Sequence, residues 1–459
     1  MEYVSTRNTK NILKFKEVFL KGLAPDGGLF IPKKIPTINL EQLNKLSSFS
    51  YTQLAEEIIF EFCKDEFNKD EIRNLVQSSY KNFRHKNVVH VKKIGKLNLL
   101  ELFYGPTLAF KDIAMQIIGN MYSKILEKYN LKINIVVATS GDTGAAAISA
   151  IKDRPNMKIF VIHPENKISE VQRKFMTTVT SNNVFNIALK GNFDDCQKVV
   201  KSLFNDKKFS SSINMSGVNS INWSRIVAQI VYYFFSYFKI AKKNEQLNFS
   251  VPTGNFGDIY AGYIAKKMGL PINKLLIATN KNDILKRVIN TGIYKPLKTE
   301  QTISPSMDIQ IASNFERLLF DVSLKNPNRI IMLMDSLNEK GEFKIEKEEL
   351  KIIKESFCAE SLSEEETKFT IKDIYNNHNI LVDPHTAVGI GAIKKFSLPG
   401  ETIVLSTAHP AKFSDAVEKE TNKVPELPKN LQYILDKKES YQVLSKDLEN
   451  IKNYILKRV

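Results

Sequence analysis

The chain has 459 residues, of which 43% are hydrophobic and 25% are charged. This length exceeds one ordinary hydrophobic core, so two or three domains or lobes are expected. The formal net charge is +16, from 66 Lys and Arg against 50 Asp and Glu, which is compatible with an anionic partner. The basic residues are scattered and form no block interleaved with aromatic residues, so the composition argues against a nucleic-acid-binding protein.

The cysteines and histidines predict neither disulfides nor a metal site. Cys63, Cys196 and Cys358 are odd in number and form no CxxC, and no HxH or HExxH spacing occurs. The first twenty residues lack the apolar segment of a signal peptide. The most apolar run, Ile226 to Phe238, is too short to cross a bilayer and is expected to be a buried helix. These features predict a cytoplasmic protein without a membrane partner.

The predicted elements divide the chain near residue 92. Residues 1–92 show helical periodicity, as in "YTQLAEEIIFEFCKDE", around a turn-rich "APDGGLFIPKKIP", which predicts a small, mostly helical N-terminal domain. Residues 93–459 repeat a β-branched apolar run, a Gly- or Ser-rich turn and a helix. This pattern predicts an α/β fold with parallel sheets covered by helices on both faces. The charged stretch 341–366 is expected to be a solvated helical face or connection without chemistry.

The stretch "YGPTLAFKD", Tyr104 to Asp112, places a lysine at the end of an apolar turn. Thr107 is expected to be the N-cap of a helix, with Lys111 in its first turn. There the positive end of the helix dipole and an apolar lining both disfavour the ammonium form. A neutral lysine is a nucleophile that forms Schiff bases with carbonyl compounds. The alternative is a solvated pair of Lys111 and Asp112 on a helix surface.

Three strand-to-helix turns are candidates for binding one ligand, because parallel sheets bind ligands where their strands end. In "VPTGNFGD", backbone N–H groups of Gly254, Asn255, Phe256 and Gly257 converge as a phosphate cradle, and Asp258 follows near the helix start. An ordinary turn remains the alternative for this motif.

The second turn offers hydroxyl groups, a carboxylate and glycines, and the third offers hydroxyl groups, a histidine and a lysine. Their residues are Ser140, Gly141, Asp142, Thr143 and Gly144 in the second, and Ser406, Thr407, His409 and Lys412 in the third. Capping of a helix is the alternative for the second turn, and a structural role is the alternative for His409. Together the three turns could hold one phosphorylated aldehyde, pyridoxal 5'-phosphate, with Lys111 as its covalent partner.

An ordered set of motifs over nearly the whole chain resembles threonine synthase. The motifs are "YVSTRN", "GLAPDGGLFIP", "YGPTLAFKD", "TSGDTGAAA", "NSINWSRI" (Asn219 to Ile226), "PTGNFGD" and "STAHPAKF". The resemblance implies a fold-type II pyridoxal-phosphate enzyme with two α/β lobes and an N-terminal extension. Two departures affect the tuning of the site rather than its covalent chemistry: Tyr104 stands where the family often has histidine, and Asn8 where glycine is common.

The resemblance also implies roles for individual residues. Lys111 looks like the Schiff-base lysine, the turn from Gly254 to Asp258 looks like the phosphate loop, and Thr407 would lie against the pyridine nitrogen. A hydroxyl at that nitrogen would leave the ring less firmly protonated than a carboxylate would.

The family's reaction converts O-phospho-L-homoserine and water to L-threonine and phosphate. Residues assigned to the substrate are Ser140, Asp142, Thr143, Arg225 and Lys412, with Arg225 preferred for the phosphate group. A structural salt bridge is the alternative for Arg225. Two rival activities are a phospho-lyase that releases a 2-oxo acid, ammonia and phosphate, and an enzyme acting on unphosphorylated serine or threonine. The oligomeric state, monomer or homodimer, stays open.

Overall fold

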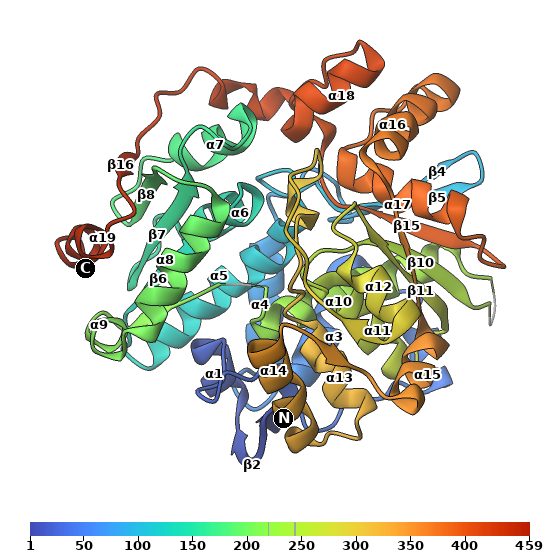
Figure 1. Cartoon of the computed structure of the whole chain (residues 1–459), viewed down its shortest axis with the longest axis horizontal. Coiled ribbons are helices and arrows are strands. Elements are labelled where there is room, and N and C mark those ends of the chain that lie inside the picture. The colour runs from blue at the N-terminus through green and yellow to red at the C-terminus, as the bar shows by residue number, and fades with distance from the viewer. Residues whose placement is uncertain (219, 243–244) are drawn as a thin grey trace.

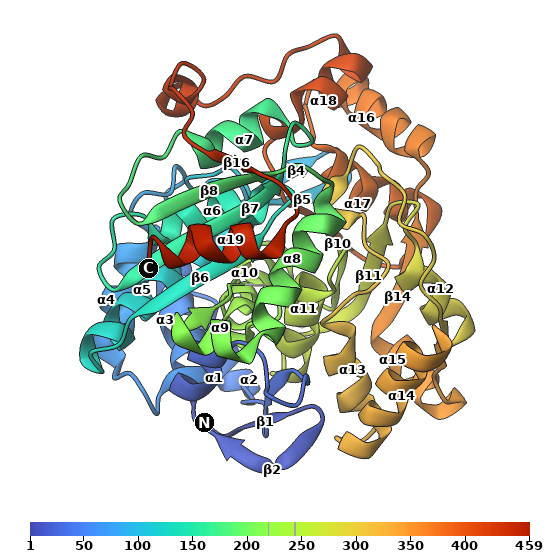
Figure 2. The same ribbon diagram turned by 60° about the vertical axis from the view of Figure 1, so that its left-hand side comes forward.

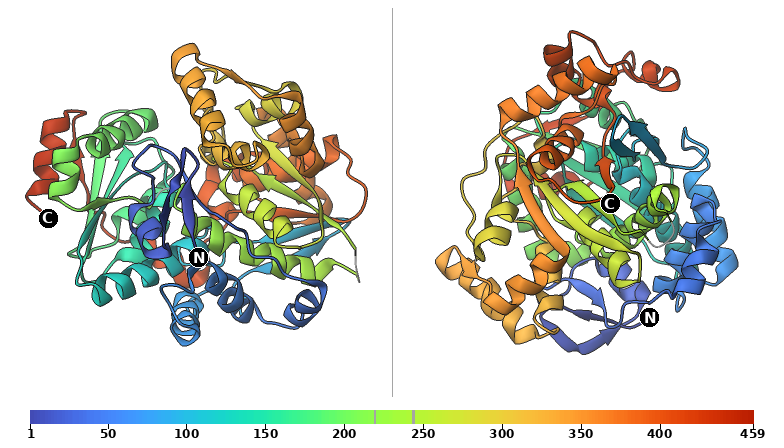
Figure 3. Two further views of the ribbon diagram at one scale, coloured as in Figure 1. Left: turned by 90° about the horizontal axis from the view of Figure 1, so that it is seen from below. Right: turned by 90° about the vertical axis from the view of Figure 1, so that its right-hand side faces the viewer.

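Two separate sheets dominate the computed structural model, which describes residues 1–218, 220–242 and 245–459 (Figure 1). Seen from below, the sheets occupy two lobes, with the N-terminal segment along one side of both (Figure 3). Asn219, the first residue of the "NSINWSRI" motif, lies outside the described residues.

The larger sheet has six strands in the order β14-β11-β10-β15-β5-β4. All neighbours are parallel except β4 and β5. The strands are β4 (His90–Ile94), β5 (Leu97–Glu101), β10 (Leu247–Pro252), β11 (Ile272–Thr279), β14 (Phe357–Ser361) and β15 (Thr402–Ser406). A two-stranded antiparallel sheet of β12 (Ile293–Tyr294) and β13 (Phe343–Lys344) belongs to the same half of the chain.

The smaller sheet has five parallel strands in the order β16-β8-β7-β6-β9. They are β6 (Ile133–Ala138), β7 (Met157–Pro164), β8 (Val184–Leu189), β9 (Met215–Ser216) and β16 (Gln442–Leu444). Alternate residues enter different hydrophobic clusters: Ile135 and Val137 join the largest cluster, whereas Val136 lies in a second cluster on the opposite face. This sheet is therefore buried on both faces, as its near-continuous apolar strands predict.

Helices cover both sheets and fill the space between them. In the smaller lobe these are α6 (Asp142–Ile151), α7 (Glu170–Thr177), α8 (Phe193–Asn205), α9 (Lys207–Ser212) and α19 (Leu448–Leu456), with α8 and α19 over one face (Figure 2). Between the lobes lie α5 (Lys111–Lys128) and α10 (Trp223–Ile240), which pack on each other. Because α10 contains the run from Ile226 to Phe238 and is buried over most of its length, the predicted buried helix is confirmed.

The larger lobe carries the remaining helices of residues 245–459. They are α11 (Gly257–Lys267), α12 (Ile284–Thr291), α13 (Phe315–Val322), α14 (Pro327–Lys340), α15 (Lys347–Ser356), α16 (Glu364–His378), α17 (Pro384–Lys395) and α18 (Ser414–Thr421), with short 3-10 helices η1 (Pro305–Met307) and η2 (Pro410–Phe413). A third short helix, η3 (Lys429–Ile434), lies beside α7 of the smaller lobe, where Lys174 donates to Leu435 O. Along the described part of the chain, no helix has both the length and the apolar character needed to cross a membrane.

The N-terminal region is mostly helical, as predicted, but it also contains a small sheet that the sequence did not reveal. Its helices are α1 (Phe15–Lys21), α2 (Leu40–Leu46), α3 (Tyr51–Cys63) and α4 (Lys69–Tyr80), and its antiparallel strands are β1 (Tyr3–Ser5), β2 (Asn8–Leu13) and β3 (Phe30–Pro32). Strands β1 and β3 have three residues each, too few to show an alternating pattern, and the six residues of β2 are mostly exposed and do not alternate. The division of the chain into residues 1–92 and 93–459 stays a prediction.

The α/β architecture with two parallel-sheet lobes is confirmed, but the expectation for residues 341–366 is partly wrong. The stretch contains helix α15, as expected, and then β14, an edge strand paired with β11. Phe357, Cys358 and Ala359 are buried in that strand. Charged residues on both sides of this short apolar run concealed it in the sequence.

Candidate active site

Lys111 is the first residue of α5, and its side chain is buried where strands of both sheets end. The preceding segment runs beside the turn after β15, because Phe110 N–H donates to Thr407 O (2.8 Å) and His409 N–H donates to Leu108 O (3.0 Å). This pairing joins the lysine turn to the third predicted turn.

Thr107 is not the N-cap of this helix, contrary to the prediction. The N-cap is Phe110, and α5 begins one residue later. The Thr107 side chain instead donates to the Asp112 carboxylate (2.6 Å), which also accepts from Thr107 N–H (2.8 Å). Asp112 is fully buried, so the alternative of a solvated Lys111–Asp112 pair is also wrong. The predicted position of Lys111 in the first turn is confirmed.

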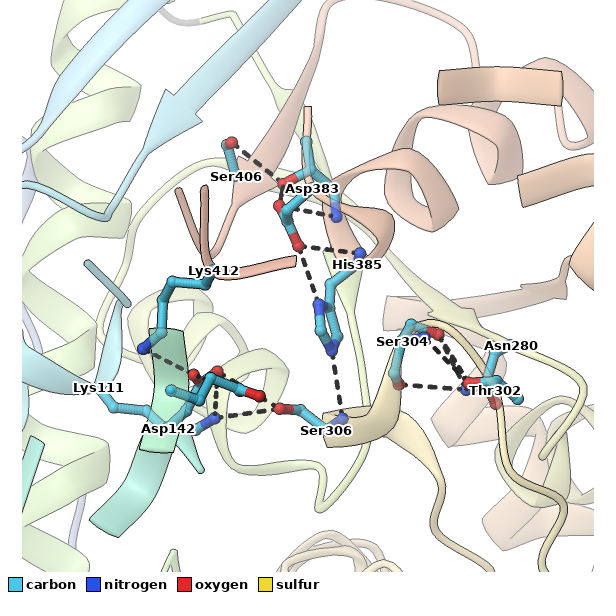
Figure 4. A network of polar contacts seen from close by, with 12 residues as sticks. Lys111, Asp142, Asn280, Thr302, Ser304, Ser306, Asp383, His385, Ser406 and Lys412 are labelled. Atoms are coloured by element: carbon cyan, nitrogen blue, oxygen red, sulfur yellow. Dashed lines mark hydrogen bonds and ion pairs between the residues drawn. The ribbon is translucent and has the colours of Figure 1, made fainter. Parts of the chain in front are cut away.

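The Asp142 carboxylate lies between two lysine ammonium groups (Figure 4). Its Oδ1 is 2.7 Å from Lys412 Nζ and its Oδ2 is 3.3 Å from Lys111 Nζ. Lys412 Nζ also donates to Thr107 O (2.7 Å), and Gln172 Nε2 donates to Asp142 Oδ1 (3.0 Å). All three charged side chains are buried. The turns after β6 and β15 therefore meet at Lys111.

The charges of this cluster shift the pKa values of its members in opposite directions. Burial, together with the positive charges of Lys412 and Arg225, lowers the pKa of Lys111, although Asp142 opposes this. Burial alone would raise the pKa of Asp142, but the ammonium groups of Lys412 and Lys111 hold that pKa well below its usual range. The pair thus keeps a firmly ionised carboxylate beside an amine whose protonated form is disfavoured.

The turn from Gly254 to Asp258 follows β10 and begins α11. Phe256 is its N-cap in the left-handed conformation, with φ of 64°, and packs on Phe315. A Cβ atom at Gly254 would come within 2.6 Å of Ser306 O, so only glycine fits this close approach. Asn255 O accepts from Asn314 N–H (3.1 Å) and from Asn314 Nδ2 (3.0 Å). Gly257 is the first residue of α11, so the turn has the predicted form.

Asp258 points away from this turn and toward α10. Its Oδ1 accepts from Tyr232 OH and from Tyr233 OH (3.0 Å), whereas its buried Oδ2 finds no partner in the described residues. Burial raises the pKa of Asp258 from 3.8 to about 7, against the hydrogen bonds of the two tyrosines and the charge of Arg225. A protonated, uncharged Asp258 carboxyl group fits this environment.

Asp258→Asn is expected to change the pH dependence of stability. Between about pH 4 and pH 7 the Asp258 carboxyl is ionised in the unfolded chain but still protonated in the native protein. Its contribution to the free energy of unfolding is therefore fully present below pH 4 and is lost as the pH rises towards 7. The asparagine amide cannot ionise and still accepts from the tyrosines. Urea unfolding measures the free energy of unfolding of both proteins. We expect the value of the variant minus that of the wild type to rise by roughly 4 kcal/mol from pH 4 to pH 8. A difference that is equal at both pH values would contradict the assignment.

Arg225 lies on α10, and its buried Nε makes no hydrogen bond within the described residues. Burial lowers the pKa of Arg225 to about 10, opposed by Tyr232 and Asp258. Its charge lowers the pKa values of both Lys111 and Asp258, so the guanidinium lies near enough to both to affect them. The salt bridges of the described residues do not include Arg225, which disfavours the alternative of a structural salt bridge.

The remaining predicted residues flank this centre. Ser140 and Thr143 are half-buried on either side of Gly141 and Asp142, and Thr407 is buried with its carbonyl bonded to Phe110 N–H. Burial lowers the pKa of His409 to about 4, and its Nδ1 accepts from Ala411 N–H (3.2 Å) at the start of η2. That capping contact supports the structural alternative for His409.

Three residues that sequence reasoning missed complete the network in Figure 4. Ser306 Oγ lies 3.3 Å from Lys111 Nζ, Ser306 N–H donates to His385 Nε2 (3.2 Å), and His385 Nδ1 lies 2.8 Å from Asp383 Oδ1. The available signal was Asp383-Pro384-His385, in which Asp383 is the N-cap and Pro384 the first residue of α17. No cluster of three or more His, Cys, Asp or Glu side chains suited to a metal occurs in the described ranges.

Comparisons with known proteins identify the family of this chain. Residues 2–80 match the family model "Threonine synthase N terminus", residues 92–333 match "Pyridoxal-phosphate dependent enzyme", and residues 386–455 match "Threonine synthase, C-terminal". Threonine synthase from Pseudomonas aeruginosa is 41% identical, with 99% of this chain and 98% of that protein covered.

Two solved structures resemble the whole chain. Pyridoxal-phosphate-bound threonine synthase from Brucella melitensis has a TM-score of 0.96 and 42% identity, covering 100% of this chain and 99% of its own. Threonine synthase from yeast has a TM-score of 0.95 and 39% identity, covering 100% and 98%. The chain therefore belongs to the threonine synthase family, within the pyridoxal-phosphate-dependent enzymes.

Proposed function

We propose that the protein converts O-phospho-L-homoserine and water to L-threonine and inorganic phosphate, with Lys111 as the covalent partner of the cofactor and as the base. The observation that carries the proposal is the buried cluster of Lys111, Asp142 and Lys412 at the strand ends of both lobes, in a chain of the threonine synthase family. A cytoplasmic location is part of the proposal and rests on three free, buried cysteines.

The residues at the site fit pyridoxal phosphate. The turn from Gly254 to Gly257 opens at the N-terminus of α11, where backbone N–H groups suit a phosphate. Arg225, whose buried Nε has no partner among the described residues, adds a positive charge that suits the anionic substrate beside the cofactor. Lys111 would hold the aldehyde, the turn from Gly254 to Asp258 would hold the phosphate, and Thr407 would face the ring nitrogen. When bound, the cofactor supplies a sink for the electron pairs left when protons are removed from the substrate.

Lys111 has the properties that the proton transfers require. Its lowered pKa makes the neutral amine accessible, and a neutral amine can remove a proton from Cα, pass it on, and then remove a second proton from Cβ of the substrate. The phosphate group then leaves from Cγ and a proton returns to Cγ. Water adds its OH at Cβ and a proton returns to Cα, which gives threonine. Asp142, itself held by Lys412, keeps the Lys111 amine in position during these steps.

Ser140, Thr143, Arg225 and Lys412 are proposed to bind the substrate phosphate. Asp142 is also assigned to the substrate site, but its ionised carboxylate would repel a phosphate and instead holds Lys412 in place. Lys412 can meet an anion only by giving up its contacts with Asp142 and Thr107. Among the described residues Arg225 has no such competing contact, and it is the preferred ligand.

Product analysis tests the activity. The holoenzyme is incubated with O-phospho-L-homoserine, and threonine and phosphate are measured together. Equal amounts of both are expected. Phosphate with a 2-oxo acid and ammonia in place of threonine would instead identify the phospho-lyase, in which water never adds at Cβ.

Arg225→Ala is expected to raise KM for O-phospho-L-homoserine about 10- to 100-fold, because a charge-assisted contact to the phosphate group contributes about 1.5–3 kcal/mol. Arg225→Lys keeps the charge but loses the planar fork, so its KM should lie between those of the alanine variant and the wild type. Steady-state kinetics measure the effect. An unchanged KM in the alanine variant would remove Arg225 from the substrate site.

A further inference from the structure

A buried histidine connects helix α17 to the turn that touches Lys111 (Figure 4). His385 Nε2 lies 3.2 Å from the backbone N of Ser306, and Ser306 Oγ lies 3.3 Å from Lys111 Nζ. The same turn, η1, carries Ser306 O into close contact with Gly254. Ser306 is therefore placed between the proposed base and the proposed phosphate turn.

The donor and acceptor roles in this chain of contacts are fixed by chemistry. A backbone N–H can only donate, so His385 Nε2 accepts and carries no proton in this arrangement. The proton lies on Nδ1, which donates to Asp383 Oδ1 at 2.8 Å. Asp383 is fully buried and also accepts from the backbone N–H groups of His385 and Thr386, so its carboxylate is held rigidly as the N-cap of α17.

His385 is not free to exchange protons with a substrate. Its ring is buried, with an exposed fraction of 3%, and it packs edge-on against Phe413 with ring centroids 4.8 Å apart. Both ring nitrogens already have protein partners. The histidine therefore acts through the residue it holds.

The other end of the same turn has its own anchor. Asn280 Nδ2 donates to Ser304 Oγ (3.0 Å), and Met307 N–H donates to Ser304 O (3.0 Å). With Ser304 fixed by Asn280, two further contacts hold Ser306 itself: its N–H donates to His385 Nε2, and its Oγ lies 3.5 Å from Asp142 Oδ2. Loss of the His385 contact would loosen the middle of the turn rather than the whole loop.

We propose that Asp383 and His385 form a positioning pair that holds Ser306 against Lys111 and so orients the lysine amine for attack on the cofactor aldehyde and for proton transfer. This proposal rests on the proposed function, because it assigns Lys111 those two roles. The positioning pair orients the Lys111 amine and does not itself react.

Two matched replacements of His385 separate the loss of its hydrogen bond to Ser306 from the loss of its packing. The side-chain amide of Gln extends about as far from Cα as Nε2 of histidine, so His385→Gln can keep an acceptor for Ser306 N–H. The amide of Asn extends only about as far as Nδ1. His385→Asn therefore keeps a hydrogen-bond partner for Asp383 but loses the acceptor for Ser306 N–H. Thermal unfolding and circular dichroism establish that both variants fold.

The first measurement is the rate at which the full chain, freed of cofactor, captures added pyridoxal phosphate on Lys111, followed by absorbance. A lost hydrogen bond of about 1.4 kcal/mol corresponds to a tenfold effect, so capture should be about tenfold slower in His385→Asn and near the wild-type rate in His385→Gln. Equal rates in both variants, whether fast or slow, would overturn the proposal.

The second measurement is kinetic, with O-phospho-L-homoserine and the holoenzyme. In His385→Asn, kcat should fall about tenfold with KM nearly unchanged, because the substrate contacts remain. Adding Ser306→Ala, which removes Oγ but keeps the N–H, should cost little more, since both changes break one pathway. Full additivity would contradict action through Ser306. If the wild type forms no threonine the proposed function fails, whereas the capture rates still judge the positioning pair.

Discussion

Lys111→Ala is expected to abolish threonine formation, with kcat/KM lowered roughly 10³-fold or more, because the variant lacks both the covalent partner of the cofactor and the base. The structure offers no substitute at this place: Lys412, the other lysine on Asp142, is fully buried and already bonded to Thr107 O. Threonine and phosphate release from O-phospho-L-homoserine measure the effect.

Two controls sharpen this experiment. Lys124 lies on the same helix with a side chain 45% exposed, so Lys124→Ala should retain full activity. Borohydride treatment of the wild-type holoenzyme, followed by peptide mass analysis, should place the reduced cofactor on Lys111. A label on another lysine, or threonine formation by the alanine variant, would contradict the assignment.

Asp142→Asn should be the most destabilising single replacement at the site. It leaves the ammonium groups of Lys111 and Lys412 buried without their shared carboxylate, and breaking a buried ion pair in this way costs about 3–5 kcal/mol. Urea unfolding of the wild type and the variant measures the loss.

The double variant Asp142→Asn with Lys412→Met tests the cause. It removes one of the two stranded charges, so we expect it to be more stable than Asp142→Asn alone, and its loss to be smaller than the sum of the two single losses. Additive losses, or a loss below about 1 kcal/mol for Asp142→Asn, would show that the cluster is solvated or rearranged rather than held by charge.

The sequence predicted those parts of the molecule that follow from local periodicity. The repeated strand, turn and helix pattern placed β6, β10 and β15 and the helices after them correctly. It also predicted that the turns carrying Asp142 and Lys412 would share one ligand with Lys111. The structure brings these two side chains to Lys111, although β6 and β15 belong to different sheets. The resemblance added the cofactor and the family.

Other parts depend on contacts between distant segments and could not be predicted. Thr107 resembles an N-cap in sequence, yet its hydroxyl donates to the buried Asp112 and the helix begins at Lys111. His385 and Ser306 are 79 residues apart, and no local pattern records that one accepts from the backbone of the other. Burial beneath another helix, α10, raises the pKa of Asp258, and two tyrosines of that helix donate to its carboxyl group.

The return of the chain to the smaller sheet at β16 has a consequence for how the protein is made. Strand β16 pairs with β8, and Ile451 and Ile455 of α19 are buried in the second hydrophobic cluster against strands made more than 250 residues earlier. A nascent chain ending before residue 442 leaves β8 as an open edge and that face without α19. The smaller lobe is therefore completed last during synthesis, after the larger one, and ribosomes that stop short release a protein with an exposed apolar face.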